Sequence, residues 1–182
     1  MQMATRNPRT RPWTRADLER LPDDGNRYEV LDGALLVTPQ AAVPHQNTAT
    51  KLAILLGAYC ARDRVGLVVA PGALPFGKNE LQPDVMVVLD PPSPLPKEWT
   101  ALPRPSLVVE VLSNSTARRD VGIKRDAYLR LGIPEYWIVD GDARTITIVR
   151  GGDPDRVVSD ALQWRPRASA DPLEIEVATL FG

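Results

Sequence analysis

The hydrophobic residues of this chain fall into two long stretches with helical spacing and a series of short runs typical of strands. In residues 44–62 apolar side chains recur every three to four positions, and residues 117–131 repeat this spacing until Gly132 and Pro134 end it. The short runs predict two strands within residues 27–37 that turn at Asp32-Gly33, and single strands at residues 65–70, 83–89, 107–112, 135–140 and 145–149.

The ends of the chain carry weaker patterns. A short helix is expected at about residues 15–21, where Thr14 is suited to cap its N-terminus. A strand is expected near residues 156–159 and a short helix near 176–181. Residues 90–105 contain six prolines and predict an extended surface loop rather than a domain boundary.

The order of these elements predicts an α/β fold with a mixed β-sheet, part parallel and part antiparallel, flanked by helices. Residues 1–12 are basic, contain two prolines, and are expected to form a flexible tail. The 182-residue chain is 43% hydrophobic, which is enough for one sizeable core. We therefore expect residues 13–182 to form a single domain.

Composition narrows the function and the cellular location. The formal net charge is −1, which is not the strongly basic balance of a protein that binds nucleic acid without help. Cys60 is the only cysteine, so neither an intrachain disulfide nor a cysteine-rich zinc site is expected. The sequence has no transmembrane segment of about 18 apolar residues and no apolar secretion signal at its start, so we expect a cytoplasmic protein with no membrane partner.

Two carboxylates stand where the hydrophobic pattern does not account for them. Glu110 lies inside the apolar run LVVEVL, where an unpaired carboxylate costs several kcal/mol. It is either half of a buried salt bridge, a residue near a solvent-exposed strand end, or a metal ligand. Asp84 opens the apolar run DVMVVL and alone is typical of a turn, but two acids from separate strands can converge at one edge of a sheet. Hard cations such as Mg²⁺ favour oxygen sites of this kind.

Lys124 is a lysine on an apolar helix face. At 100° per residue it shares the inward side of the 117–131 helix with Val121 and Tyr128, while the arginines lie on the other side. One interpretation is a structural i, i+4 pair with Asp120, at the margin of that face. The other is that Lys124 serves a buried functional site.

Glu29 and His45 are weaker candidates. Alternation places Glu29 opposite Tyr28 and Val30, so it is equally interpretable as a solvent-facing strand residue. His45, the only histidine, lies near the start of the first long helix on its apolar face. A lone histidine in that place is more often a core residue with one hydrogen bond than a catalyst.

With these residues in place, the chain resembles the Uma-two family of restriction-endonuclease-like proteins within the PD-(D/E)XK nuclease superfamily. The resemblance is carried by RYEVLDG, the helix beginning PHQ, QPDVMVV, LVVEVLSNST and DVGIKRDAYLRLGIPEYWIVD, which span roughly Tyr28 to Asp140. It implies a restriction-endonuclease-like fold with a four-stranded mixed sheet flanked by helices.

The resemblance also implies roles for the candidate residues. Asp84 and Glu110 match the acids that bind Mg²⁺, for which Mn²⁺ can substitute, and the carbonyl of Val111 is a plausible further ligand. Glu29 matches an acid near the metal. The superfamily lysine usually follows the second acid by two residues, where this chain has Leu112, and the match in the Uma-like proteins is Lys124 from the next helix.

The resulting hypothesis is Mg²⁺-dependent hydrolysis of nucleic-acid phosphodiester bonds, with DNA as the expected substrate. Lys124 would orient the attacking water or stabilise developing charge, and His45 would assist the leaving group. A homodimer is expected if both strands of a duplex are cut. Two alternatives stay open: a catalytically inactive nuclease fold that serves as a binding or assembly module, and a metal-dependent hydrolase with a different substrate. The exposed arginines of the second helix are candidate phosphate contacts or simply a solvated face: Arg118, Arg119, Arg125 and Arg130.

Overall fold

The computed structural model describes residues 11–112 and 117–181, with the backbone alone for residues 117–121. Its centre is a six-stranded sheet with the strand order β10-β9-β8-β7-β6-β3. The strands are β3 (Gly66–Val69), β6 (Val85–Leu89), β7 (Leu107–Val111), β8 (Glu135–Asp140), β9 (Thr145–Val149) and β10 (Arg156–Val158). Neighbouring strands are antiparallel except β7 and β8, which are parallel and joined through helix α2 (Ala117–Arg130).

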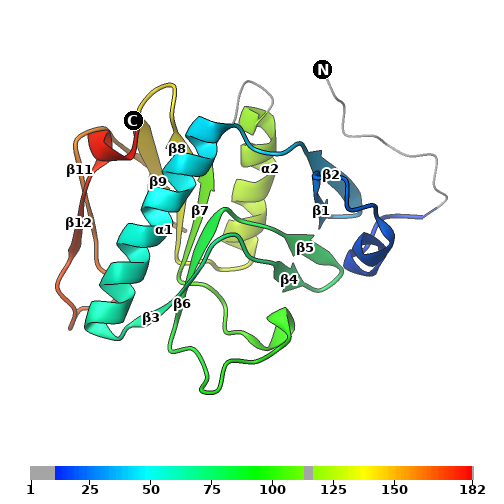
Figure 1. Ribbon diagram of the computed structural model, residues 1–182, viewed down its shortest axis with the longest axis horizontal. Helices are drawn as coiled ribbons and strands as arrows, with labels where there is room; N and C mark the ends of the chain where they lie inside the picture. The colour runs from blue at the N-terminus through cyan, green and yellow to red at the C-terminus, as the bar shows by residue number, and fades with distance from the viewer. Residues whose placement is uncertain (1–10, 113–116, 182) are drawn as a thin grey trace.

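The two long helices cover opposite faces of this sheet (Figure 1). Helix α1 (Val43–Asp63) packs Leu52 and Leu56 against the odd-numbered residues of β7, Leu107 and Val109. On the other face, Tyr128 of α2 packs in a cluster that includes the even-numbered Val108. This alternation along one strand determines which helix each side chain of β7 meets.

A second, four-stranded antiparallel sheet has the order β2-β1-β5-β4. Its strands are β1 (Arg27–Leu31), β2 (Ala34–Thr38), β4 (Leu74–Phe76) and β5 (Asn79–Leu81). Leu31 and Leu81 join the cluster on the α2 side of the main sheet. The β4–β5 hairpin was not expected, because its strands are three residues long and mostly half-buried, which leaves no clear apolar alternation.

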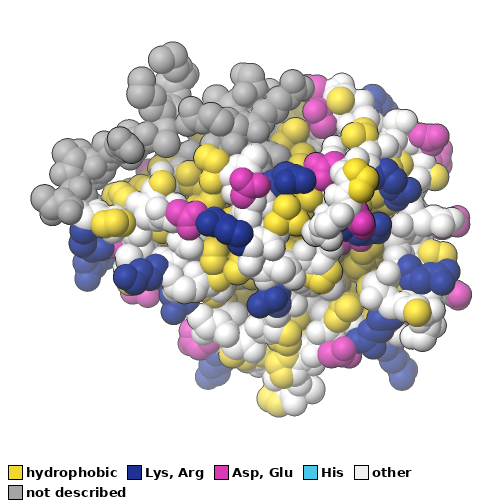
Figure 2. All heavy atoms as spheres, turned by 180° about the vertical axis from the view of Figure 1, so that it is seen from behind, with side chains coloured by type: hydrophobic (Ala, Val, Ile, Leu, Met, Phe, Trp, Pro, Cys, Tyr) yellow, Lys and Arg dark blue, Asp and Glu magenta, His cyan; other side chains and the backbone are white. Residues whose placement is uncertain are grey.

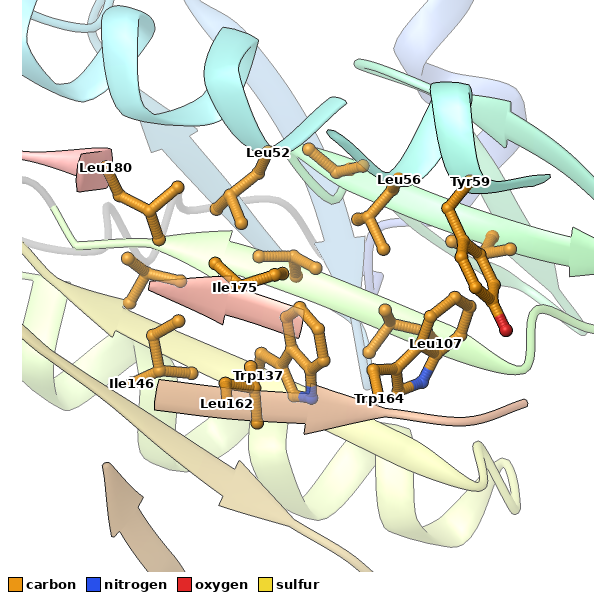
Figure 3. Close-up of a cluster of buried hydrophobic side chains, with 14 of the residues drawn as sticks. Leu52, Leu56, Tyr59, Leu107, Trp137, Ile146, Leu162, Trp164, Ile175 and Leu180 are labelled. Atoms are coloured by element: carbon orange, nitrogen blue, oxygen red, sulfur yellow. The ribbon is translucent and has the colours of Figure 1, made fainter. Parts of the chain in front are cut away.

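The C-terminal segment completes the core on the α1 side. Strands β11 (Ala161–Trp164) and β12 (Leu173–Glu176) form a hairpin whose Leu162, Trp164 and Ile175 point at Trp137 and the α1 side chains (Figure 3). Neither strand was expected. Together they close the apolar surface that α1 alone would leave open.

The main predictions for the fold are confirmed, with corrections at the margins. All eight predicted strands and both long helices occur, and the molecule is a mixed α/β sheet flanked by helices. The main sheet has six strands, so the four expected from the resemblance are too few. The short terminal helices are 3₁₀ turns, η1 (Arg15–Arg20) and η3 (Val177–Leu180), and a third such turn, η2 (Trp99–Ala101), lies in the proline-rich loop.

Most of the predicted N-terminal tail, residues 1–10, lies outside the described residues. Arg11 is described, and its guanidinium bonds Asp17 at 2.6 Å and 3.0 Å. Thr14 occupies the predicted N-cap position, where its backbone N–H and hydroxyl both donate to the Asp17 carboxylate. Among the described residues, no helix is both long and apolar enough to cross a bilayer.

Candidate functional site

Antiparallel pairing of β6 and β7 brings Asp84 and Glu110 to the same edge of the main sheet. Val85 at the start of β6 pairs with Val109 near the end of β7, so Asp84, one residue before Val85, comes beside Glu110. The backbone N–H of Val111 donates a 2.8 Å hydrogen bond to Asp84 Oδ2. The predicted convergence of two acids from separate strands is therefore present, and the β7 backbone orients one of them.

Glu110 is a buried carboxylate on the α2 side of the sheet. Its side chain lies on the same face as that of Val108, and helix α2 supplies both of its described hydrogen-bond donors. Lys124 Nζ lies 3.0 Å from Glu110 Oε1, and the Tyr128 hydroxyl donates to the same oxygen at 2.7 Å. The interpretation of Glu110 as a residue near a solvent-exposed strand end is wrong, because this residue is only 4% exposed. The buried salt bridge exists and does not exclude a metal ligand.

Glu29 is also buried, which corrects the solvent-facing interpretation. Its strand is covered on both sides, because Val30 packs against Trp13 while Leu31 packs on the α2 side. Lys124 Nζ lies 2.8 Å from Glu29 Oε1, and the Gln82 backbone N–H donates to that oxygen at 2.7 Å. Within the described part of the chain, Glu29 Oε2 is buried without a hydrogen-bond partner.

Lys124 therefore joins two acids from different sheets. It is 5% exposed, and its ammonium group contacts the carboxylates of Glu29 and Glu110. The Asp120 side chain of the alternative i, i+4 pair lies outside the described side chains. Lys124 is thus buried, as its position on the apolar face of the helix predicts.

Asp84 holds the other half of the site. Arg27 Nη1 donates to its Oδ1 at 2.7 Å, and His45 Nε2 lies 3.3 Å from its Oδ2. Arg27 comes from β1, and His45 comes from the first turn of α1. The structure therefore brings together all five predicted side chains, in two linked groups: Asp84 with His45, and Glu110 with Lys124 and Glu29.

Burial and charge shift the pKa values of these groups in different directions. Burial alone would raise the pKa of Asp84, but His45 and the positive charge of Arg27 outweigh it and lower that pKa to about 2. Burial raises the pKa of Glu110 in spite of the nearby Lys124 charge. The pKa of Lys124 is raised because the two acids outweigh the effect of its burial. Lys124 is thus a stable cation, whereas burial disfavours the charged form of Glu110.

A cleft of about 430 Å³ opens beside the Asp84 half of the site. Arg27, His45 and Asp84 line one part of its wall. The rest comes mainly from the segment after β2, from α1 and from the turn after β3, with residues that include Pro39, Gln40, Gln46, Ala53, Ile54 and Pro71. A ligand in the cleft therefore has direct access to a carboxylate, a guanidinium and an imidazole.

Sequence reasoning missed Arg27, Tyr128 and Gln82 as parts of the site. Tyr128 could have been found, since it shares the inward helix face with Lys124 and carries a hydroxyl that needs a partner when buried. Arg27 opens an ordinary strand run, and nothing in its local pattern shows that it reaches across to a second sheet. Gln82 acts through its backbone N–H, for which the side-chain sequence carries no signal.

The donor chemistry of this site fits a hard divalent cation bound by few protein ligands. Among the described residues, no group of three or more His, Cys, Asp or Glu side chains is arranged to hold a metal ion. Mg²⁺ commonly uses one or two carboxylates and takes its other ligands from water and substrate phosphate. Asp84 and Glu110 would be those carboxylates, and the unpartnered Glu29 Oε2 is a further buried acceptor. The Val111 group seen at the site is its amide, so a ligand role for its carbonyl stays a prediction.

The arginines predicted as phosphate contacts are partly engaged elsewhere. Arg125 binds Asp155 at 2.7 Å, and Arg130 binds Asp32 at 2.6 Å. The side chains of Arg118 and Arg119 lie outside the described ones. On the face shown in Figure 2, basic and acidic side chains are interspersed, and no broad basic surface is visible. This distribution agrees with the near-neutral charge of the chain.

Comparison with known proteins matches this chain to a family model and to several solved structures. A family model described as "Uma2: Putative restriction endonuclease" matches residues 15–178. A solved structure from Anabaena variabilis ATCC 29413, described as "a putative nuclease belonging to DUF820", superposes with a TM-score of 0.73. It is 19% identical, and the match covers 93% of this chain and 98% of that one, so this likeness concerns the fold. No curated protein matches significantly. Because the family model spans nearly the whole chain, the protein belongs to the Uma2 family of restriction-endonuclease-like proteins.

Proposed function

We propose that this protein is a Mg²⁺-dependent nuclease that hydrolyses phosphodiester bonds in DNA, with Mn²⁺ able to replace Mg²⁺. The observation that carries the proposal is the convergence of Asp84 and Glu110 on one sheet edge with the buried Lys124 beside Glu110. Membership of the Uma2 family supports the nuclease class. The metal, DNA as substrate, a homodimeric state and a cytoplasmic location remain predictions.

Each residue has a proposed task that follows from its position. Asp84 and Glu110 would hold the cation, which when bound would polarise the phosphate and lower the pKa of a water. The Val111 N–H fixes the orientation of Asp84, so that its carboxylate is positioned before any ligand arrives. Lys124 keeps its proton and would hold the attacking water or stabilise negative charge on the phosphate oxygens.

Two further side chains have supporting roles in this proposal. Glu29 holds the Lys124 ammonium at 2.8 Å, and its buried second oxygen would accept a hydrogen bond from a water at the site. His45 lies on the cleft side of Asp84, where its imidazole would assist departure of the leaving oxygen.

A direct test compares cleavage of DNA and RNA, each single- and double-stranded, with Mg²⁺, Mn²⁺ or a chelator. The proposal predicts metal-dependent cleavage of DNA that Glu110→Gln and Asp84→Asn abolish while the fold remains intact. Metal-dependent cleavage of RNA alone would instead support the metal-dependent hydrolase with another substrate. Substrates left intact under every condition would contradict the nuclease.

A specific observation also favours the inactive module. Arg27 and Lys124 already neutralise much of the acid cluster, and no three-ligand group is present among the described residues. In that alternative the ion pairs only stabilise the fold, and the cleft binds a partner without catalysing a reaction. The absence of divalent-cation binding, with and without DNA, would favour this alternative over the nuclease.

A further inference from the structure

Asp84 presents its two carboxylate oxygens to different groups. Oδ2 accepts the Val111 backbone N–H at 2.8 Å, and His45 Nε2 lies 3.3 Å from it. Oδ1 accepts Arg27 Nη1 at 2.7 Å. The backbone holds the first oxygen independently of any cation. Arg27 therefore pairs with Oδ1, the oxygen that the β7 backbone leaves free.

Arg27 is attached to Asp84 by one corner of its guanidinium. Within the described residues, its hydrogen bonds all come from Nη1, which bridges Asp84 Oδ1 and the Gln82 carbonyl oxygen at 3.0 Å. Its Nε is buried without a partner. Arginine typically binds a carboxylate with two parallel hydrogen bonds. A pair made through a single nitrogen leaves the planar fork able to bind a second anion.

The cleft shows where that second anion would lie. Arg27 is 23% exposed in its side chain and lines the 430 Å³ cleft together with His45 and Asp84. His45 is 8% exposed, and its Nδ1 is buried without a partner among the described residues. A phosphate at this wall would meet donors on Arg27 beside the carboxylate proposed to bind metal.

We propose that Arg27 is the resting counter-ion of Asp84 and becomes the anchor of the substrate phosphate when Asp84 binds a divalent cation. This inference rests on the proposed function and identifies the ligand of the cleft wall as a phosphodiester of the nucleic acid. Asp84 exchanges one cation for another, so its charge remains compensated throughout. Arg27 keeps its proton and binds the phosphate through the fork geometry that suits guanidinium to phosphate. The empty protein thus avoids an uncompensated buried carboxylate.

The first test is metal binding by Arg27→Met, measured calorimetrically with Mn²⁺ in the absence of DNA. If Arg27 competes for Asp84, its removal raises metal affinity, with coupling on the order of 5–150-fold as is typical between linked ligands. Arg150→Met is the matched control, because Arg150 also bonds a buried acid of the main sheet, Glu135 at 2.8 Å, away from the site. An affinity for Mn²⁺ that is unchanged or lower in Arg27→Met than in the wild type would overturn the inference. The absence of Mn²⁺ binding in both the wild type and Arg27→Met would also overturn it.

The second test is affinity for a labelled DNA duplex with saturating Ca²⁺ as the probe ion, with the DNA checked for cleavage by gel. Because Arg27→Met loses a charged phosphate contact, its affinity for DNA is expected to fall on the order of tenfold. Arg150→Met should bind DNA with the affinity of the wild type. Unchanged DNA affinity would overturn the phosphate role.

Arg27→Lys covers the case in which the methionine variant does not fold. The lysine keeps a charge at Asp84 but lacks the planar fork, so metal affinity should stay within about threefold of wild type while DNA affinity falls. Wild-type DNA affinity in this variant would overturn the inference. Failure of this inference is distinguishable from failure of the proposed function. If Arg27→Met binds metal more tightly but the wild type cleaves no nucleic acid, the nuclease function is contradicted, while the exchange of Arg27 for a cation at Asp84 is supported.

Discussion

The Lys124 ammonium group lies 3.0 Å from the Glu110 carboxylate, with both side chains almost completely buried. Removing one partner of such a pair leaves an uncompensated charge in the interior. We expect Lys124→Met to lower the free energy of unfolding by about 3–5 kcal/mol, measured by urea denaturation. Arg62→Met, which removes an exposed pair with Asp63, is the control and should cost no more than about 1 kcal/mol.

The double variant Lys124→Met/Glu110→Gln separates pairing from packing. Because the neutral glutamine no longer needs a cation, the double variant should be more stable than the sum of the two single losses implies. Glu29 also contacts Lys124, so recovery should be partial. Strict additivity of the two single effects would contradict an energetic pairing of these residues.

Two neighbouring tyrosines provide a matched test of the hydrogen bonds at Glu110. The Tyr128 hydroxyl donates to Glu110 Oε1 at 2.7 Å, whereas the Tyr136 hydroxyl is buried without a partner among the described residues. Tyr128→Phe should therefore destabilise the protein by about 1–3 kcal/mol, and Tyr136→Phe should be neutral or slightly stabilising. Thermal or urea unfolding of both variants checks this order. Equal losses would mean that the bond to Glu110 contributes nothing specific.

The lowered pKa of Asp84 predicts a loss of stability in acid. A carboxyl whose pKa falls from 3.8 when unfolded to about 2 when folded stabilises the fold fully above the unfolded value. That contribution is lost as the pH falls from about 4 towards 2, because the unfolded chain takes up the proton first. Urea unfolding between pH 5 and pH 2.5 should show a weaker dependence on pH for Asp84→Asn than for wild type. Parallel profiles would contradict the lowered pKa.

Cys60 reports on the integrity of the fold. It is 2% exposed on α1, and burial raises the pKa of its thiol to about 11. Because the thiolate is the reactive form, alkylation by iodoacetamide at pH 8 should be slow in the native protein and fast in urea. Mass spectrometry gives the labelled fraction. Rapid native labelling would mean that α1 does not pack on the sheet as described.

The sequence was most informative where one element has one clear periodicity. Helical spacing identified α1 and α2 and placed Lys124 on a buried face, and apolar runs identified the strands of the main sheet. The short strands of the β4–β5 and β11–β12 hairpins escaped prediction. Their place depends on tertiary packing, as Trp164 and Ile175 show by burying themselves against distant parts of the chain.

The residues of the candidate site also differ in whether local sequence patterns reveal them. Asp84, Glu110 and Lys124 stand out because each breaks a local rule, a charge within an apolar run or face. Glu29 and Arg27 break none, because a charged residue in a short strand is ordinary until a second sheet covers it. The burial of Glu29 and the partial burial of Arg27 arise from packing between the two sheets, which local sequence patterns do not encode.

The measurement that tests the central claim most directly is calorimetric titration with Mg²⁺ or Mn²⁺, repeated with a DNA duplex present. We predict that wild type binds the ion, that Asp84→Asn and Glu110→Gln abolish binding, and that Glu135→Gln, a change at another buried acid of the main sheet, preserves it. No binding by wild type under either condition, or binding that survives both substitutions, would contradict a metal-dependent site at Asp84 and Glu110.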